Sequence, residues 1–252
     1  MTNKFQNFKT NEECFEYLKE ARNKKWEEII SSSNWVKFIM SKNFDKRFYG
    51  IYLIETYHYV NENPRHQAVI ALRETDAPIN YLKFCYEHAE EETGHEMMAY
   101  HDLKSLGLAN DEIKIETPLS STEILIAYLY RISQYGNPLR RLGYSFWAED
   151  SYQYIQELLK TIAETLYLGK ENMTFLVSHS TIDEKHSKEI EEMIVRFCKN
   201  SNDFNSILEI MNVTLTLQSN MLDEVVNEYI KLEKNESSKY SFLNNISISV
   251  NE

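Results

Sequence analysis

Residues 175–193 read FLVSHSTIDEKHSKEIEEM, a stretch with the periodicity of an amphipathic helix. At 100° per residue, Asp183 and His186 fall within about 60° of His179, on the side that also carries the apolar residues. Two imidazoles and a carboxylate therefore project toward the core, where unpaired polar groups are costly. A metal ion would offset that cost, because histidine and carboxylate ligands suit iron, manganese or zinc. A polar core network, or a helix nearer the surface, explains the triplet equally well.

The rest of the chain also predicts helices. Its 252 residues include only 6 glycines and 4 prolines, whereas an all-β sandwich or barrel needs many more turn residues. Pro64 is expected to end one helix, because the residue before a proline disfavours α geometry. We expect one all-helical domain over residues 1–235 and a flexible tail, rich in Ser and Asn, over residues 236–252. The expected helices cover about residues 11–41, 46–62, 65–74, 78–106, 121–135, 138–168, 171–200 and 203–234.

Composition and charge exclude several classes of function. The net charge of −12 gives a surface that repels phosphate backbones. No apolar run approaches the length that spans a membrane, and the first residues lack the apolar core of a signal peptide. The three cysteines are widely separated and have no metal-finger spacing, which fits a reduced compartment. These observations predict a cytoplasmic protein with neither a nucleic-acid nor a membrane partner.

A second cluster of ionisable residues lies in the segment 85–96, which reads CYEHAEEETGHE. On a continuous helix, His88, Glu91 and Glu92 fall near His95, on a face that also carries apolar residues. The pair Glu92-x-x-His95 puts a carboxylate and an imidazole one turn apart, so that both can hold one metal ion. An acidic run on a helix surface is the simpler explanation, and the cluster alone is a weak signal.

The two clusters together make a more specific pattern. Two carboxylate-x-x-His pairs, ending at His95 and His186, lie on different predicted helices. Glu55 and Glu149 lie on two further helices that are otherwise apolar or aromatic. Two such pairs with carboxylates from two other helices form the pattern of a dinuclear iron or manganese site in a helical bundle. The carboxylates would balance two divalent cations and leave positions open for dioxygen.

On these residues the chain resembles the haem-oxygenase-like diiron oxidases and oxygenases, all-helical proteins related in fold to thiaminase II and PQQ-synthesis proteins. The hallmark of the family is His-x-x-x-Asp-x-x-His on a late helix, which residues 179–186 match. The family has a glutamate upstream of that motif, matching Glu149, and an earlier glutamate and histidine near a glycine, matching Glu92, Gly94 and His95. The resemblance implies a haem-oxygenase-like bundle of about seven helices.

The resemblance also implies a cofactor of two iron ions, with manganese as another possible metal. Glu91 is an alternative to Glu92, because both face inward on the predicted helix. Glu55 is outside the family's ligand set and is expected to be an extra ligand, a base beside the ligands or a substrate contact. His88 is expected to lie beside the ligands. The implied ligands are Glu92, His95, Glu149, His179, Asp183 and His186.

An oxygen-dependent oxidase or oxygenase is the function that the resemblance implies. Dioxygen would be the co-substrate, and a small amine, amino acid or carboxylic acid would undergo N-oxygenation or oxidative C–C cleavage through a peroxo-diferric intermediate. A homodimer and an external electron donor are expected partners. Four arginines are candidates to bind a substrate carboxylate through paired hydrogen bonds, namely Arg65, Arg131, Arg140 and Arg141.

Two other functions are compatible with the pattern. A ferritin-like iron-oxidising or storage protein has similar helical carboxylates, although such sites rarely need a third histidine such as His179. A metal-free, thiaminase-like hydrolase or binding protein on the same fold would need a cysteine nucleophile or a ligand pocket. Cys85 lies on an inward-facing helix but has no evident activating base.

Overall fold

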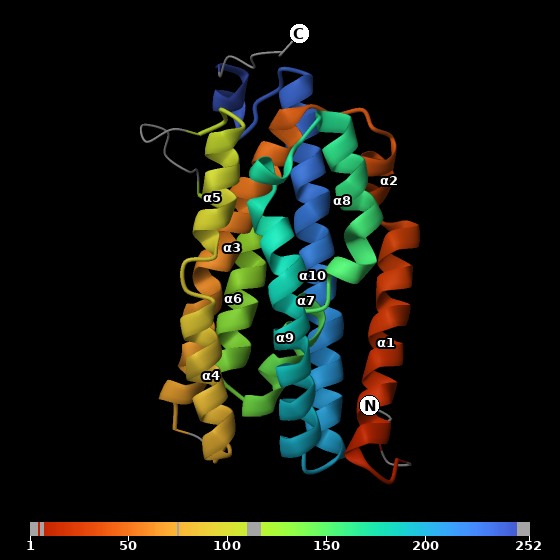
Figure 1. Cartoon of the computed structure of the whole chain (residues 1–252), viewed down its shortest axis with the longest axis vertical. Helices are drawn as coiled ribbons and strands as arrows, with labels where there is room; N and C mark the ends of the chain where they lie inside the picture. The colour runs from red at the N-terminus through yellow and green to blue at the C-terminus, as the bar shows by residue number, and fades with distance from the viewer. Residues whose placement is uncertain (1–4, 6–7, 75, 110–116, 246–252) are drawn as a thin grey trace.

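The computed structural model describes residue 5 and residues 8–74, 76–109 and 117–245, with the backbone alone described over 179–184. Within this part of the chain there are ten α-helices, three 3-10 helices and no strand, so the all-α prediction is confirmed and the expected number of helices was too low. The helices form an elongated bundle (Figure 1). The α-helices are α1 (Asn11–Ser32), α2 (Asn34–Met40), α3 (Lys46–Leu72), α4 (Ile79–Glu91), α5 (Glu96–Ser105), α6 (Ser120–Gln134), α7 (Leu142–Ala148), α8 (Tyr152–Leu166), α9 (Thr174–Phe197) and α10 (Ser201–Glu233), and the 3-10 helices are η1 (Pro138–Arg141), η2 (Lys170–Asn172) and η3 (Ser241–Asn245).

Helix α10 is the central element of the bundle. It packs against α1, α2, α3, α6 and α7, and it runs along most of the length of the molecule (Figure 1). Ile207, Met211 and Leu215 recur every four residues along it and are almost fully buried, as expected for the core-facing stripe of a helix. Helix α7 lies against this stripe at Gly143, where an added Cβ would collide with the carbonyl oxygen of Ile207. This close approach fixes the position of the short helix that precedes Glu149.

Helix α3 continues through Pro64, so the prediction that it ends at Glu62 was wrong. Proline lacks an amide hydrogen and is costly inside a helix. The buried face of α3 nevertheless extends past the proline, from Asn63 through His66 to Ile70. Tertiary packing of this face outweighs the local preference of proline to end a helix.

Three predicted helices are broken in the structure, and the one over 11–41 is divided into α1 and α2. Helix α4 ends at Glu91, and a turn containing Gly94 at a φ of +98° precedes α5, because glycine adopts this left-handed region without steric cost. The predicted helix over 138–168 is divided into η1, α7 and α8. Glu92 and Glu149 therefore occupy the residues directly after the ends of α4 and α7.

Part of the predicted flexible tail contacts the bundle. Tyr240 and Leu243 are fully buried, and the Tyr240 hydroxyl donates a hydrogen bond to Glu55. Lys239 Nζ donates to the carbonyl of Pro118 at 2.5 Å. These contacts anchor the segment at Tyr240 and Leu243, because two buried apolar side chains are enough to hold a short polar segment, and the boundary of the tail stays a prediction. Residues 246–252 lie outside the described part of the chain.

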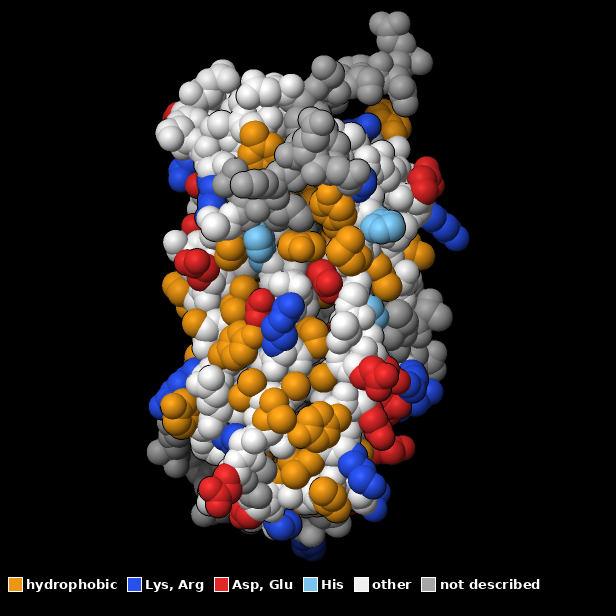
Figure 2. All heavy atoms as spheres, turned by 90° about the vertical axis from the view of Figure 1, so that its left-hand side faces the viewer, with side chains coloured by type: hydrophobic (Ala, Val, Ile, Leu, Met, Phe, Trp, Pro, Cys, Tyr) orange, Lys and Arg blue, Asp and Glu red, His pale blue; other side chains and the backbone are white. Residues whose placement is uncertain are grey.

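One face of the bundle carries exposed apolar side chains. Leu72, Ile79 and Tyr86, on α3 and α4, are exposed, and Figure 2 shows apolar side chains gathered over the lower half of this side of the molecule. Such gatherings are typical of protein contacts, but the homodimer stays a prediction. None of the described helices is both long enough and apolar enough to cross a membrane.

Candidate metal centre

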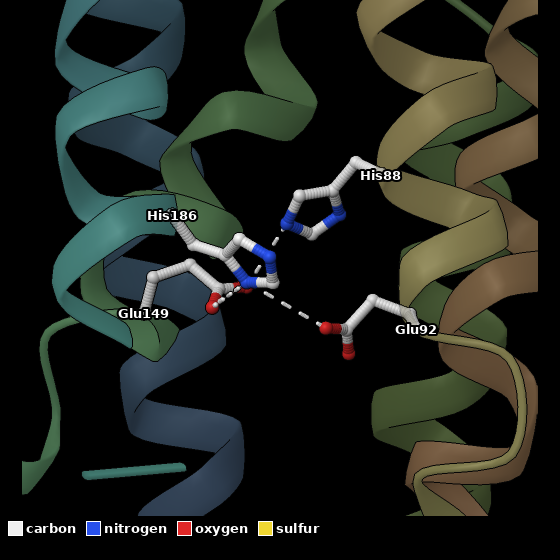
Figure 3. Close-up of side chains that lie close together, drawn as sticks. All are labelled: His88, Glu92, Glu149 and His186. Atoms are coloured by element: carbon white, nitrogen blue, oxygen red, sulfur yellow. Dashed lines mark hydrogen bonds and ion pairs between the residues drawn. The ribbon is translucent and has the colours of Figure 1, made fainter. Parts of the chain in front are cut away.

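Four buried side chains converge inside the bundle, each from a helix or its end. They are His88 on α4, Glu92 after α4, Glu149 after α7 and His186 on α9. One ligand atom from each lies within 4.8 Å of those of the other three, and Figure 3 shows all four side chains pointing toward one another. Carboxylates and imidazoles are the ligand types that iron, manganese and zinc accept.

His186 and His88 make the closest contacts of the group. His186 Nδ1 lies 3.1 Å from Glu149 Oε2 and 3.8 Å from Glu92 Oε1. His88 Nε2 lies 3.4 Å from Glu149 Oε1. The two imidazole rings are 4.7 Å apart between centroids. Glu149 is therefore between two imidazoles, with Glu92 facing it across the group.

The charges of these side chains depend on one another. Burial opposes ionisation of Glu149, but contacts with His186 and His88 hold its pKa well below the usual range of a glutamate. Burial disfavours protonation of His186, but the contacts with Glu149 and the negative charge of Glu92 raise its pKa to about 9. At neutral pH and without metal, His186 is protonated and Glu149 is ionised. A bound cation would take the place of that proton.

The structure brings three of the six predicted ligands together, namely Glu92, Glu149 and His186. His95 lies beside them, with Nδ1 at 3.3 Å from Glu92 Oε1. The side chains of His179 and Asp183 lie outside the described residues, although both positions fall within α9, on the same helix as His186. The full six-ligand set therefore stays a prediction.

Glu91, the alternative to Glu92, lies at the outer edge of the group. Its Oε2 is 3.0 Å from His186 Nε2, and its Oε1 is 2.6 Å from Lys185 Nζ. Glu91 is exposed and Glu92 is buried. The side chain that faces Glu149 in the interior is Glu92, and Glu91 contacts His186 from the solvent side.

The structure places Glu55 in a different group of residues. Its carboxylate is fully buried and accepts hydrogen bonds from the hydroxyls of Tyr240 and Thr122 and, at 3.0 Å, from the backbone amide of Leu119. These three donors come from the C-terminal segment and from the start of α6. Glu55 therefore joins separate segments of the chain, and it is not brought to the four converging side chains.

His88 is the member of the group that the sequence analysis placed only beside the site. It precedes Glu92 by four residues, the spacing of neighbours on one helix face. That spacing was the available signal. Acidic residues on either side, at Glu87 and Glu90, made the segment resemble a solvated helix face.

The group fits a divalent cation better than a closed network of hydrogen bonds. Neither ring nitrogen of His88 nor Oε1 of Glu92 makes a hydrogen bond within the described residues, although all three atoms are buried. Buried polar atoms without a partner are costly. A metal ion would satisfy Glu92 Oε1 and one nitrogen of His88 at once, because each offers it a lone pair, while the other nitrogen of a neutral imidazole carries the proton.

Comparison of the sequence with models of known families finds a match over most of the chain. The model of a family described as iron-containing redox enzymes matches residues 51–219, more than half of the chain. This chain is a member of that family. A solved domain of unknown function from Shewanella denitrificans, described as having a haem-oxygenase-like fold, is 40% identical and covers 89% of this chain and 97% of its own, with a TM-score of 0.85. The predicted family and the haem-oxygenase-like fold are both confirmed.

More distant structures of the same fold come from archaea. A TenA homologue from Pyrococcus furiosus is 16% identical, with a TM-score of 0.65 over 84% of this chain and 99% of its own. A TenA homologue from P. horikoshii is 14% identical, with the same TM-score and 97% of its own chain covered. At this identity the likeness shows the fold alone. None of the curated proteins matches this chain.

A cavity of about 160 Å³ adjoins the metal group in this family member. Glu92 and Glu149 line it, and most of its remaining wall is apolar or aromatic. None of the four arginines considered for substrate binding is part of this wall. The lining also includes Trp26, Trp35, Phe48, Tyr59, Asn63, Tyr144, Trp147, Leu158, Phe175 and Leu222.

Proposed function

We propose that this member of the iron-containing redox enzymes is a non-haem diiron oxidase or oxygenase that uses dioxygen to oxidise a small organic molecule. One observation carries the proposal: a buried group of two carboxylates and two imidazoles, with unsatisfied lone pairs, lines an apolar cavity. Two ferrous ions, when bound, would supply the activation of dioxygen.

Glu92, Glu149 and His186 would hold the ions, with His88 and His95 close to them. His179 and Asp183 on α9 are proposed as the remaining ligands, since they precede His186 on this helix by about two turns and about one turn. The protein contributes an interior with little water, in which the ligands keep fixed positions. The apolar wall of the cavity holds the substrate beside them and limits side reactions with solvent.

The lining of the cavity narrows the substrate class. Among the residues whose side chains the structure describes, the charged ones in this lining are Glu92 and Glu149, so this part of the wall offers no cation to a second charged group on the substrate. A zwitterionic amino acid would bring a carboxylate and an ammonium into an apolar space, where an unpaired charge is costly. We therefore propose an amine or a carboxylic acid with one polar head and an apolar body. The head would lie near the two glutamates and the body against the aromatic wall.

Both candidate reactions need electrons from outside the protein. In N-oxygenation, one oxygen atom of dioxygen is inserted into an N–H bond. The other oxygen atom is reduced to water with two electrons and two protons from an external donor. In oxidative cleavage of a carboxylic acid, the substrate loses carbon dioxide and becomes an alkene. Dioxygen is reduced to two water molecules, with two electrons and two protons from the substrate and two of each from the external donor.

A thiaminase-like hydrolysis has less support in this structure. Such chemistry needs a reactive cysteine at the ligand pocket. Cys14, Cys85 and Cys198 are all buried and none lines the cavity. Burial raises the pKa of Cys85 to about 11, so its thiol is protonated at neutral pH.

An anaerobic titration with ferrous iron, followed by a pulse of dioxygen, tests the proposal. We expect binding near two equivalents of iron and iron-dependent consumption of dioxygen, both lost in His186→Ala. A screen of single-headed amines and carboxylic acids against amino acids of similar size then tests the substrate class. Absence of stoichiometric iron binding would overturn the proposal. Oxidation of many iron equivalents per chain by a large shell-like assembly would support the storage alternative instead.

A further inference from the structure

A buried arginine lies behind the metal group. Arg141 is only 2% exposed, at the end of η1. Its Nη2 donates to Asn63 Oδ1 at 2.8 Å, its Nη1 to Ser145 Oγ at 2.5 Å and its Nε to His66 Nδ1 at 3.4 Å. Burial and the charge of Arg141 hold the pKa of His66 well below its usual value, so His66 is neutral. All three acceptors are therefore uncharged, and none of them neutralises the guanidinium.

Asn63 connects this arginine to the metal group. Its Nδ2 donates to Glu92 Oε2 at 2.8 Å. Arginine has donors only, so the oxygen of the Asn63 amide must face Arg141 and its NH2 group must face Glu92. The arginine thus fixes which way the amide points. The amide in turn holds Oε2 of Glu92, while Oε1 stays within 3.3 Å of His95 Nδ1 and 3.8 Å of His186 Nδ1.

The fold holds Asn63 and His66 next to Arg141. Asn63 and His66 are three residues apart on α3, so they share the helix face that meets Arg141. They share it only because α3 continues through Pro64. Arg141 does not line the cavity, whereas Asn63 does. The arginine is therefore separated from any substrate, and its contacts lead toward Glu92.

We propose that Arg141 and Asn63 are positioning residues that orient the carboxylate of Glu92 for metal binding. The inference rests on the metal site of the proposed function. Hydrogen-bond partners of metal ligands fix the orientation of those ligands, and their loss typically weakens metal binding by about 10- to 100-fold. Asn63 is such a partner of Glu92, and Arg141 holds Asn63 in the orientation that lets it donate.

Titration of the metal-free protein with Co²⁺, followed by visible absorption, tests the inference without turnover. Asn63→Leu keeps the approximate shape of the side chain and removes the donor, so we expect Co²⁺ affinity to fall by about 10- to 100-fold with an altered d–d spectrum. Arg141→Lys keeps the charge but cannot hold Asn63 and Ser145 together, and we expect a smaller loss in the same direction. Ser145→Ala removes a buried contact of Arg141 that does not lead to Glu92, and its affinity should stay close to wild type.

Combining Asn63→Leu with Glu92→Gln separates positioning from a general loss of structure. If Asn63 acts through Glu92, Asn63→Leu should lower the Co²⁺ affinity of the Glu92→Gln protein hardly any further, because the effects of coupled residues are not additive. Equal losses in both backgrounds, or wild-type affinity and spectrum in Asn63→Leu, would overturn the inference. If Asn63→Leu does not fold, Arg141→Lys is measured in the same two backgrounds. Wild-type protein that binds no Co²⁺ would instead overturn the metal site itself, and the inference with it.

Discussion

Two groups of buried carboxylates in this bundle have opposite surroundings. Glu55 is fully buried and accepts hydrogen bonds from two hydroxyls and one backbone amide. Glu92 and Glu149 face two imidazoles, and both His88 ring nitrogens and one Glu92 oxygen have no hydrogen bond within the described residues. A buried polar group is stable only when it is satisfied. The protein alone supplies the hydrogen-bond donors of the first group, whereas the second group would be satisfied by a bound metal ion.

This contrast separates structural from functional carboxylates more sharply than sequence did. In the sequence, Glu55 and Glu149 looked alike, because each is an acidic residue on an otherwise apolar or aromatic helix. What differs is the identity of the neighbours that the fold brings to each. Glu55 meets donors from residues far along the chain, Leu119, Thr122 and Tyr240, whereas Glu149 meets imidazoles.

We expect the largest effect from Glu149→Gln, on the iron-dependent consumption of dioxygen. The substitution keeps the shape of the side chain but removes the charge that would balance a cation between His88 and His186. We expect iron-dependent consumption of dioxygen to be abolished in an oxygen-electrode assay. Glu55→Gln is the matched control and should bind iron as the wild type does. Loss of iron binding in Glu55→Gln, with activity retained in Glu149→Gln, would reverse the assignment of the two groups.

The next effect is on stability, from Glu55→Ala. The change leaves the hydroxyls of Tyr240 and Thr122 and the amide of Leu119 without their acceptor. We expect the free energy of unfolding to fall by about 3 kcal/mol in chemical denaturation of the metal-free protein, because each buried unsatisfied group costs about 1–3 kcal/mol. A loss of well under 1 kcal/mol would mean that Glu55 does not hold these segments together.

The sequence was sufficient for the fold class and for part of the site. The helical periodicity of apolar residues and the scarcity of glycine and proline predicted an all-helical bundle, and the spacing of Asp183 and His186 led to a metal hypothesis. The breaks after α4 and α7 were missed, because local patterns show which residues favour helix but not where two helices must change direction to bring Glu92 and Glu149 together. The role of Asn63 was hidden for the same reason, since its partners lie far along the chain.

A pH-dependent effect follows from His186, whose pKa is raised to about 9 in the folded protein, from about 6.5 in the unfolded chain. A raised pKa in the folded state stabilises the fold below the unfolded value, and this contribution is lost as the pH rises through about 9. Metal-free protein should therefore lose stability between about pH 6.5 and 9 in thermal melts. Metal binding displaces the same proton, so Co²⁺ affinity should rise over that range. Glu149→Gln should weaken both trends, and a pH-independent affinity in the wild type would contradict the protonated state of His186.

The smallest expected effect tests how far the Glu55 group acts apart from the metal group. Tyr240→Phe removes one hydroxyl and leaves Glu55 with its other two donors. The net contribution of a typical hydrogen bond is about 0.5–1.5 kcal/mol, so the loss of stability should be smaller than that of Glu55→Ala. Because the carboxylate stays satisfied, iron stoichiometry and the Co²⁺ spectrum should not change. A shifted spectrum in Tyr240→Phe would show that α3, which carries both Glu55 and Asn63, transmits strain from one group to the other.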